Sequence, residues 1–402
     1  MTIVHVTPYY APAWAWGGVV EAVSGLARAQ AAAGHRVAVV TTDTLGPFER
    51  GPSERRIVDG VDVVRVRTRS PWLRGALNLS WPVGFGAATR ACLEDLRPAV
   101  VHCHELRTVE TLVASRIASR LAVPVVLSPH GTLPYLTGRR WAKYAWDLCF
   151  GRTTLERTTH VVALTRAEAV EVAVVCRRWR VPRLAGRCSV VQNGVDVERY
   201  GRLPGKEAAR RRLGLPLERP VALFLGRLDA RKGVDLLVEA GEKLAAGGHP
   251  VHLLIAGPDA GVRRAVEAQV SRLGCDRRVS MPGLLVGDTK LAALAAADVM
   301  ALPSYGEGLP MAVLEALAAG VPVVAARETH LDGIERAGAG LLVDRTADSL
   351  AGGLLTVVRD HARRAEMARR ARTLAAERHG WQAVIPQLDR VYEQCAIEGV
   401  AR

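Results

Sequence analysis

The chain is poor in several features that mark whole classes of protein. Aromatic residues make up only 5% of its 402 residues, and no apolar run reaches the roughly 20 residues that a bilayer-spanning helix needs. Its seven cysteines are odd in number and lack the spacing of a disulfide framework, which predicts reduced thiols in a cytosol. The first residues lack the basic and apolar regions of a signal peptide. We therefore expect a cytoplasmic protein.

Motifs for three other kinds of chemistry are also missing. The G-x4-G-K-[ST] order of a P-loop is absent, and no DxD metal motif is obvious. No recognition helix or base-stacking motif indicates nucleic-acid binding. We accordingly expect no metal, no other cofactor and no nucleic-acid partner.

The chain does have a marked basic excess and enough residues for two domains. The formal net charge is +14, and residues 1–200 carry 26 Lys and Arg against 16 Asp and Glu. This first half could contact an anionic membrane surface, an acidic acceptor or nucleic acid. An arginine-rich genome would produce the same composition without any such role.

The most informative stretch is residues 298–326, DVMALPSYGEGLPMAVLEALAAGVPVVAA. Its apolar segments 299–302 and 321–326 are short enough for buried parallel strands, and the Ala-, Leu- and Met-rich segment between them favours a helix. Pro310 suits the first turn of that helix, and Gly320 can cap its end. The stretch thus predicts a strand, a glycine-containing loop, a helix and a second strand.

The start of this helix is a candidate anion site, because free N–H groups and the positive end of the helix dipole meet there. Carboxylates are unusual beside a phosphate, yet Glu307 lies in the loop and Glu315 on the helix. Both are explained if they accept hydrogen bonds from the hydroxyls of a nucleotide sugar, whose diphosphate binds the helix end. The alternative is a solvated loop acid with an ordinary helix glutamate. The expected donor-binding residues here also include Gly308, Leu309 and Pro310.

A second anion site is predicted after the strand 221–225, in the turn GRLDARKG. Gly226 leaves the backbone open to a ligand, and Arg227 and Lys232 supply two cations at a strand-to-helix turn. We interpret them as diphosphate ligands, with ordinary surface charges as the alternative. A later short segment, which ends at Leu285, could flank a base with its backbone groups.

The first half opens with a predicted β-α-β unit, formed by strand 3–7, helix 19–33 and strand 36–42. Gly17 and Gly18 open the helix at the carboxyl end of the first strand, where open α/β sheets bind ligands, and we expect both to be donor-binding residues. Simple turn chemistry would also explain a lone pair of glycines.

Histidines follow two later strands of this half. His102 and His104 end the strand 99–104 and point to one face, so a metal site is conceivable, but no third ligand lies at a telling spacing. His130 follows the strand 123–128 and precedes a glycine, which predicts a place in a cleft. We favour a contact with the donor sugar or the acceptor over a structural role.

The segment 134–159 alternates basic and aromatic residues at helical spacing. Trp141, Tyr144 and Leu148 would form one stripe, bordered by cations. The stripe could rest on a membrane interface and present a lipid-linked acceptor. We favour the alternative, a helix that packs this stripe into the core and leaves its arginines solvated.

Several of these motifs together resemble the group 1, retaining glycosyltransferases of the GT-B fold. The most specific is E-x7-E inside PSYGEGLPMAVLEALAAGVPVVA, while GRLDARKG, SPHG, GHRVAVVTT and NGVD match other segments of that family. The resemblance implies an α/β protein with two Rossmann-like domains facing across a cleft. Residues 1–193 would bind the acceptor, residues 194–379 the nucleotide sugar, and a terminal helix at 380–402 would cross back to the first domain.

The resemblance also implies a role for each matching residue. Arg227 and Lys232 would neutralise the leaving nucleoside diphosphate, Glu307 would hold hexose hydroxyls, Glu315 the ribose, and His130 the far side of the sugar. We expect His130, Glu307, Arg227 and Lys232 to be the catalytic residues. No residue is an obvious nucleophile, so the cations and the helix end would stabilise the departing charge without a metal.

The implied activity is transfer of a hexose-type sugar from a nucleotide sugar to a hydroxyl of a glycan or lipid-linked acceptor, with retention of configuration. Such an enzyme would serve polysaccharide and cell-envelope biosynthesis, in the cytoplasm or peripherally on the inner face of the membrane. Two alternatives stay open: a nucleotide-sugar epimerase or hydrolase of the GT-B fold, and a basic membrane- or nucleic-acid-binding protein. The segment RETHLDGIERAGAGLLV departs from the family pattern and leaves the far end of the donor pocket undefined.

Overall fold

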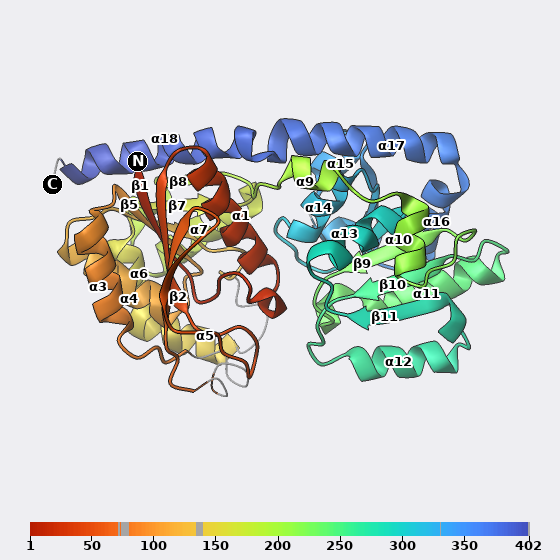
Figure 1. Ribbon diagram of the computed structural model, residues 1–402, viewed down its shortest axis with the longest axis horizontal. Coiled ribbons are helices and arrows are strands. Elements are labelled where there is room, and N and C mark those ends of the chain that lie inside the picture. The colour runs from red at the N-terminus through yellow and green to blue at the C-terminus, as the bar shows by residue number, and fades with distance from the viewer. Residues whose placement is uncertain (71–72, 74–79, 134–139, 330, 401–402) are drawn as a thin grey trace. The chain divides into compact units, whose positions relative to one another are not determined.

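The computed structural model of the chain describes residues 1–70, 73, 80–133, 140–329 and 331–400. The chain divides into two compact units (Figure 1). One unit comprises Met1–Gly194 together with Trp381–Arg402, and the other comprises Val195–Gly380. No helix among the described residues combines the length and the apolar character that a bilayer crossing requires.

The first unit is built on an eight-stranded sheet in the order β3-β4-β2-β1-β5-β6-β7-β8. Its strands are β1 (Thr2–Val6), β2 (Arg36–Thr42), β3 (Arg55–Val58), β4 (Val61–Val66), β5 (Val100–His104), β6 (Val125–Ser128), β7 (His160–Ala163) and β8 (Cys188–Val190). All neighbours are parallel except β3 and β4, which are antiparallel. The sheet is therefore a parallel α/β sheet with one added edge strand.

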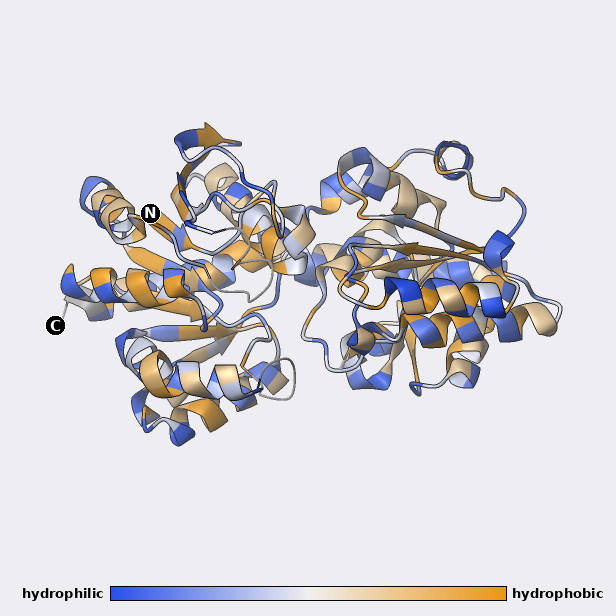
Figure 2. Ribbon diagram, turned by 90° about the horizontal axis from the view of Figure 1, so that it is seen from below, coloured by the Kyte–Doolittle hydropathy of each residue, from blue (hydrophilic) through white to orange (hydrophobic). Residues whose placement is uncertain are grey.

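The central strands of this sheet are largely apolar because both of their faces are covered. Every residue of β5 is buried, including His102 and His104, and four of the five residues of β1 are buried, including His5. In Figure 2 the strands are mostly hydrophobic, whereas the helices alternate between hydrophobic and hydrophilic residues. His5, His102 and His104 are thus polar side chains placed on two buried central strands.

Helices connect the strands of the first unit. They are η1 (Trp14–Trp16), α1 (Gly18–Ala32), α3 (Phe85–Leu96), α4 (Val109–Arg120), α5 (Arg140–Trp146), η2 (Asp147–Gly151), α6 (Arg152–Arg157), α7 (Arg166–Arg178), α8 (Pro182–Ala185) and α18 (Trp381–Val400). The last of them, α18, packs Leu388 and Tyr392 into one cluster with Ile3, Val100 and Val126 of the sheet. The end of the chain thereby completes the core of the unit in which the chain begins.

The edge strand β3 is an element that the sequence analysis missed. It pairs with β4 through a two-residue turn at Asp59 and Gly60, whose φ angles are 51° and 78°. An Asp-Gly pair with two positive φ angles is a strong signal for a tight hairpin, so the information was present in the sequence.

The helical segment around Trp141 corrects a second expectation. Residues 134–139 of the predicted segment lie outside the described residues, and the remainder forms α5, η2 and α6. Trp141 is 74% exposed, Leu148 63% and Tyr144 45%, so the favoured interpretation of a core-packed stripe is wrong. These side chains form an exposed apolar surface beside the cations Arg140 and Lys143.

The second unit is built on a six-stranded, fully parallel sheet in the order β11-β10-β9-β12-β13-β14. Its strands are β9 (Val221–Leu225), β10 (His252–Ala256), β11 (Val279–Gly283), β12 (Val299–Leu302), β13 (Val323–Ala326) and β14 (Gly340–Val343). Its helices are α9 (Val197–Gly201), α10 (Lys206–Arg212), η3 (Ala230–Lys232), α11 (Val234–Ala246), α12 (Arg263–Arg272), η4 (Asp276–Arg278), α13 (Gly287–Ala296), α14 (Met311–Ala319), η5 (Arg327–Thr329), α15 (Asp332–Arg336), α16 (Ala347–Arg359), α17 (His361–Leu374) and η6 (Ala375–His379).

Both sheets reverse their strand order beside a central strand. In the first unit β1 lies between β2 and β5, and in the second β9 lies between β10 and β12. Open parallel sheets bind ligands outside the carboxyl ends of their strands at such a reversal. The loops that follow β1, β5, β9 and β12 are therefore the places where a site is expected.

Candidate active site

In the second unit, the loops after β9 and β12 touch each other. Gly233 has a φ of 64°, and a Cβ on it would lie 2.3 Å from the carbonyl oxygen of Pro303. The backbone N–H of Tyr305 donates to the carbonyl of Arg231 at 2.8 Å. Only glycine fits this approach, which explains the residue that follows Lys232 in the turn.

The contact between these loops brings two of the predicted site residues together. The ammonium group of Lys232 donates to Oε1 of Glu307, and the two side chains are 15% and 17% exposed. One residue ends the short helix η3 and the other lies in the loop before α14, 75 positions later in the chain. The sequence predicted both residues for the donor site, but it did not predict that they pair.

Arg227 lies at the start of the same turn and is more open to solvent. Its side chain is 46% exposed, and its nearest acid, Asp229, lies 3.8 Å away. Asp229 caps η3 by accepting from the N–H of Arg231 at 3.0 Å. Its other oxygen is buried and has no hydrogen-bond partner among the described residues. A buried acceptor of this kind is uncommon in folded proteins and marks a polar environment beside the cation.

Helix α14 begins at this place with free donors. Val313 and Leu314 donate their N–H groups to the carbonyl of Pro310, and Met311 and Ala312 precede them. The geometry of an α-helix leaves such first N–H groups without an intrahelical partner. Ser304, in the loop before the helix, is fully buried, and its hydroxyl has no partner within the described part of the chain. The helix end thus offers donors and partial positive charge to an anion.

Glu315 lies on the second turn of α14 and is 4% exposed. Its partner is Lys290 of α13, whose ammonium group lies 2.8 Å from Oε1 and whose side chain is 14% exposed. The sequence analysis missed Lys290. The one available signal was a single lysine near the start of a helix, which is too common to identify a site.

The remaining predicted donor residues of the second unit lie on the same edge of its sheet. Gly226 directly follows β9, Leu285 lies half-buried between β11 and α13, and Leu309 is 8% exposed. A Cβ on Gly308 would meet nothing within 4 Å, so the loop is open there. Gly257, which the sequence analysis did not select, packs so closely that a Cβ on it would lie 1.8 Å from the carbonyl oxygen of Gly226.

In the first unit, the predicted glycines open helix α1. Gly17 is its N-cap, with a φ of 88°, and Gly18 is its first residue. They end the loop that leaves β1 at the reversal of the strand order. Tyr9 and Trp16 stack in this loop with their ring centroids 4.2 Å apart, so the approach to α1 is formed by ordered aromatic side chains.

His130 follows β6 in a strained turn. Its φ is 54° and that of Gly131 is 72°, and a non-glycine residue in this region is uncommon. Glu168 holds the turn, because its carboxylate accepts from the N–H of Gly131 and from the N–H of Leu164, both at 2.6 Å. Burial raises the pKa of Glu168, and the two hydrogen bonds oppose that shift. The sequence analysis missed this buried acid, which supports the loop that presents His130.

His130 also ends a chain of hydrogen bonds through the core. The chain joins seven side chains from β1, β5, β6, the loop after β6, α1 and α18: His130, His104, His5, Gln30, Tyr392, His102 and Ser128. We call it the histidine network. Burial lowers the pKa of His5 and of His130 to about 4, and it lowers the pKa of His102 and of His104 well below the usual range. All four imidazoles are therefore neutral at physiological pH.

Three members of this network could also be metal ligands. His5, His102 and His104 offer ring nitrogens within 4.8 Å of one another, and His5 is the third ligand that the sequence analysis did not find. Each of their six ring nitrogens already has a hydrogen-bond partner in the network. The cluster is thus fully satisfied by hydrogen bonds, and we interpret it in those terms.

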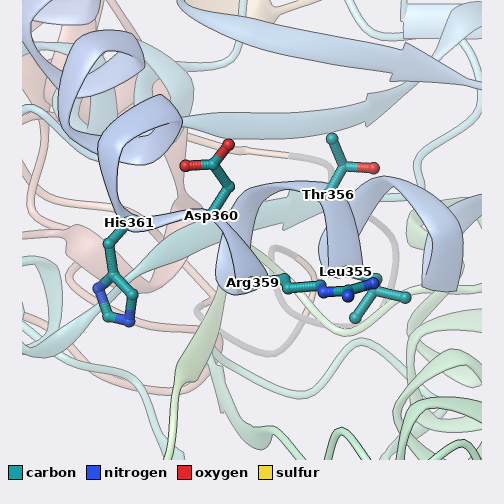
Figure 3. A pocket seen from close by; sticks show the side chains of 5 residues that line it. All are labelled: Leu355, Thr356, Arg359, Asp360 and His361. Carbon is teal, nitrogen blue, oxygen red and sulfur yellow. The ribbon is translucent and has the colours of Figure 1, made fainter.

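Neither of two cavities is lined by the predicted donor-binding loops of the second unit. A small cavity of about 20 Å³ borders the histidine network, with His104, His130, Asn193 and Trp381 in its lining. A larger surface hollow, of about 510 Å³, lies where α16 ends and α17 begins and is lined by Leu355, Thr356, Arg359, Asp360 and His361 (Figure 3). All five residues come from the end of α16, the start of α17 and the one residue between them, and none belongs to the predicted site.

Comparison with known proteins assigns the chain to a family. Residues 16–199 match the family described as Glycosyltransferase Family 4, and residues 205–374 match the one described as Glycosyl transferases group 1. An uncharacterised glycosyltransferase of Methanocaldococcus jannaschii is 28% identical, over 98% of both chains. A D-inositol 3-phosphate glycosyltransferase of Acidothermus cellulolyticus is 31% identical, over 99% of this chain and 90% of its own.

Solved glycosyltransferase structures share the fold. Sucrose-phosphate synthase from Thermosynechococcus elongatus superposes with a TM-score of 0.76 at 22% identity, over 98% of both chains. HepE of Anabaena, in complex with UDP and glucose, gives 0.73 at 19% identity, over 98% of this chain and 100% of its own. These likenesses confirm the predicted GT-B fold. Together with the family matches and the relative that aligns along nearly the whole chain, they show that the protein is a glycosyltransferase enzyme and belongs to the group 1 glycosyltransferases.

Proposed function

We propose that the protein transfers a hexose-type sugar from a nucleotide-sugar donor to a hydroxyl acceptor, with retention of configuration, and that the second unit binds the donor. The observation that carries this proposal is the pair formed by Lys232 and Glu307 beside the N-terminus of α14, at the reversal of the strand order. A cation, a helix end and an acid at one sheet edge match the diphosphate and the hydroxyls of a nucleotide sugar.

The paired side chains have enough hydrogen-bonding groups to bind each other and also the phosphate and the sugar. An ammonium group has three N–H donors, and Lys232 gives one of them to Glu307. The other two remain for phosphate oxygens. A carboxylate has two oxygens, and Glu307 uses Oε1 for Lys232, so Oε2 remains for a sugar hydroxyl. The pair would thus join the group that leaves to the group that is transferred.

Catalysis would come from stabilising the charge that develops on the departing diphosphate. Arg227 and Lys232 would supply two full charges, and the first N–H groups of α14 would add directed donors. We propose that these groups replace a divalent metal ion. Glu315, held by Lys290, would accept from the ribose hydroxyls. Leu285 would flank the base, and His130 would contact the sugar or the acceptor.

The relatives bear on the acceptor through their names alone. One is a D-inositol 3-phosphate glycosyltransferase, and WaaG, a structural neighbour with a TM-score of 0.71, is a glycosyltransferase involved in lipopolysaccharide biosynthesis. We propose a hydroxyl-bearing glycan or lipid-linked acceptor for this chain. An exposed apolar surface at α5, with Trp141 and Leu148 beside Arg140 and Lys143, supports peripheral contact with an anionic membrane on its cytoplasmic side.

The test is a panel of nucleotide sugars screened by thermal stabilisation, followed by turnover with and without acceptors. We expect one donor to raise the melting temperature and to be consumed only when a hydroxyl acceptor is present. The anomeric configuration of the product, read by NMR, then tests retention. Consumption of donor without any acceptor would instead identify a hydrolase or an epimerase, and stabilisation by none of the donors would refute the proposal.

A further inference from the structure

The histidine network has a direction that follows from its one amide. Oε1 of Gln30 lies 2.6 Å from Nε2 of His5, and Nε2 of Gln30 lies 3.3 Å from the hydroxyl of Tyr392. An amide oxygen can only accept a hydrogen bond and an amide nitrogen can only donate one. His5 must therefore carry its proton on Nε2, and the tyrosine hydroxyl must accept from Gln30.

The orientation of the Gln30 amide then fixes which ring nitrogen carries the proton in His5, in His104 and finally in His130. A neutral imidazole has one donor and one acceptor nitrogen, so Nδ1 of His5 accepts from Nε2–H of His104 at 3.0 Å. Nδ1 of His104 in turn accepts from Nε2–H of His130 at 2.9 Å. Nδ1 of His130 is then an acceptor.

The second branch returns to the same turn of the chain. The hydroxyl of Tyr392 accepts from Gln30, and its own proton is satisfied within the network when it donates to Nδ1 of His102, 2.7 Å away. Nε2–H of His102 then donates to Oγ of Ser128 at 2.8 Å. Ser128 precedes His130 by two positions, so both branches end at the strained turn after β6.

Burial decides which member a substrate can reach. His5, His102 and His104 are at most 1% exposed, whereas His130 is half-buried at the end of the network. The three inner imidazoles also lack any acid in the network that would stabilise a positive charge. They are suited to keep one fixed tautomer each and not to exchange protons with solvent.

We propose that Gln30 and Tyr392 are positioning residues for glycosyl transfer, because through the histidine network they hold His130 with its proton on Nε2 and its Nδ1 lone pair directed to a substrate hydroxyl. This inference rests on the proposed function for its last step, the contact with substrate. Its first step, the proton position on His130, is a property of the free protein. The terminal helix α18 thereby acts on the reaction through Tyr392.

The experiment uses the full chain with 15N-labelled histidine. Two-bond 1H–15N spectra report which ring nitrogen of each histidine carries the proton, and we expect His130 of the wild type to be protonated on Nε2. In Tyr392→Phe and in Gln30→Met we expect His130 to become a mixture of both forms, and kcat to fall about tenfold, with the KM for the donor nearly unchanged. His130→Ala identifies the His130 signals.

Tyr200→Phe is the matched control. Tyr200 is 3% exposed and Tyr392 is fully buried, so each substitution removes one hydroxyl from a buried ring, but Tyr200 belongs to the second unit and lies outside the network. We expect its spectra and its kcat to equal those of the wild type. A melting temperature measured for each variant separates lost positioning from lost folding.

Three outcomes would overturn the inference. Wild-type His130 protonated on Nδ1 would contradict the proton order, and unchanged His130 spectra in Tyr392→Phe and Gln30→Met would show that these residues do not set it. A shifted proton with unaltered kcat would show that His130 does not serve the reaction in this form. Failure of the proposed function is distinct, because it would appear as absent donor-dependent transfer in the wild type while the spectra still report the proton order.

Discussion

The site loops of the second unit contain charged side chains, whereas the histidine network of the first unit contains neutral ones. Lys232 with Glu307 and Lys290 with Glu315 are charged pairs that lie half-buried or buried at one sheet edge. The network in the first unit is neutral, and burial keeps it so. A charged ligand requires charges that are already in place, because unpaired charges in a dry site are costly. A hydroxyl requires only a donor or an acceptor of defined direction, which a neutral imidazole provides.

The largest expected effect is a loss of stability at acid pH, which should be greater in the first unit than in the second. The pKa of His5 and of His130 in the folded protein is about 4, below the unfolded value of about 6.5. Between these values the unfolded chain binds more protons, so stability is complete above pH 6.5 and is lost as the pH falls toward 4. Each such histidine contributes a slope of up to about 1.4 kcal/mol per pH unit.

Hydrogen exchange read by mass spectrometry at pH 7 and pH 5, corrected for intrinsic rates, measures this difference. Peptides of β1 and β5 should lose protection by much more than peptides of β9 and β12. The second unit contributes His252, whose pKa burial also lowers to about 4, so we expect a smaller loss there and not none. Equal losses in both units would contradict the comparison.

The next effect comes from breaking a charged pair where it is buried. Lys290→Met should remove the ammonium group that lies 2.8 Å from the carboxylate of Glu315, which is 4% exposed. Removing one partner of a buried pair destabilises a protein by about 3 kcal/mol. Urea denaturation measures the change in the free energy of unfolding. Lys243→Met is the control, since Lys243 pairs with Asp348 at 2.7 Å on the surface, and we expect a change under about 1 kcal/mol. Similar losses in both variants would refute this account.

Much of the charged site in the second unit, at the loops after β9 and β12, could be predicted from the sequence because its signals are local. Residues 298–326 form the expected strand, loop, helix and strand, with α14 beginning directly after Pro310 and capped by Gly320 in the left-handed conformation. Helix propensity, proline and glycine act within a few residues, so these elements can be predicted from neighbouring residues alone. The parallel strands were recognisable for a similar reason, because each is short and apolar on both faces.

The neutral network could not be predicted, because its contacts are distant in sequence. Gln30 and Tyr392 are separated by 362 positions, and His5 and His104 by 99. No local pattern distinguishes a tyrosine on the terminal helix that faces a histidine from one that packs in the core. The exposed stripe at Trp141 failed differently: its periodicity indicated an apolar face, but periodicity does not say what covers that face.

A smaller effect is expected in turnover. Lys232→Ala and Glu307→Ala should each lower the rate of transfer by at least about tenfold, or 1.4 kcal/mol of barrier, because each removes a group that we assign to the leaving diphosphate or to the sugar. Since the two residues pair directly, the double variant should lose less than the product of the two single losses. Initial rates with saturating acceptor measure this, with Lys243→Ala as the surface control. Near-wild-type turnover in both single variants would refute the assigned roles.

The smallest expected effect concerns the exposed apolar surface of the first unit, at Trp141, Tyr144 and Leu148, which should bind lipid. Leu148 is 63% exposed, so Leu148→Ser should leave the melting temperature unchanged but weaken cosedimentation with anionic vesicles about fivefold, near 1 kcal/mol of lost apolar burial. Ile397, 72% exposed on α18, gives the matched control Ile397→Ser, which should bind as the wild type does. Phosphatidylcholine vesicles should bind all three proteins weakly, because their headgroups carry no net negative charge to attract the basic first half. Equal binding of Leu148→Ser and the wild type would mean that this surface does not contact the membrane, and charge alone would then account for any attraction of the basic first half.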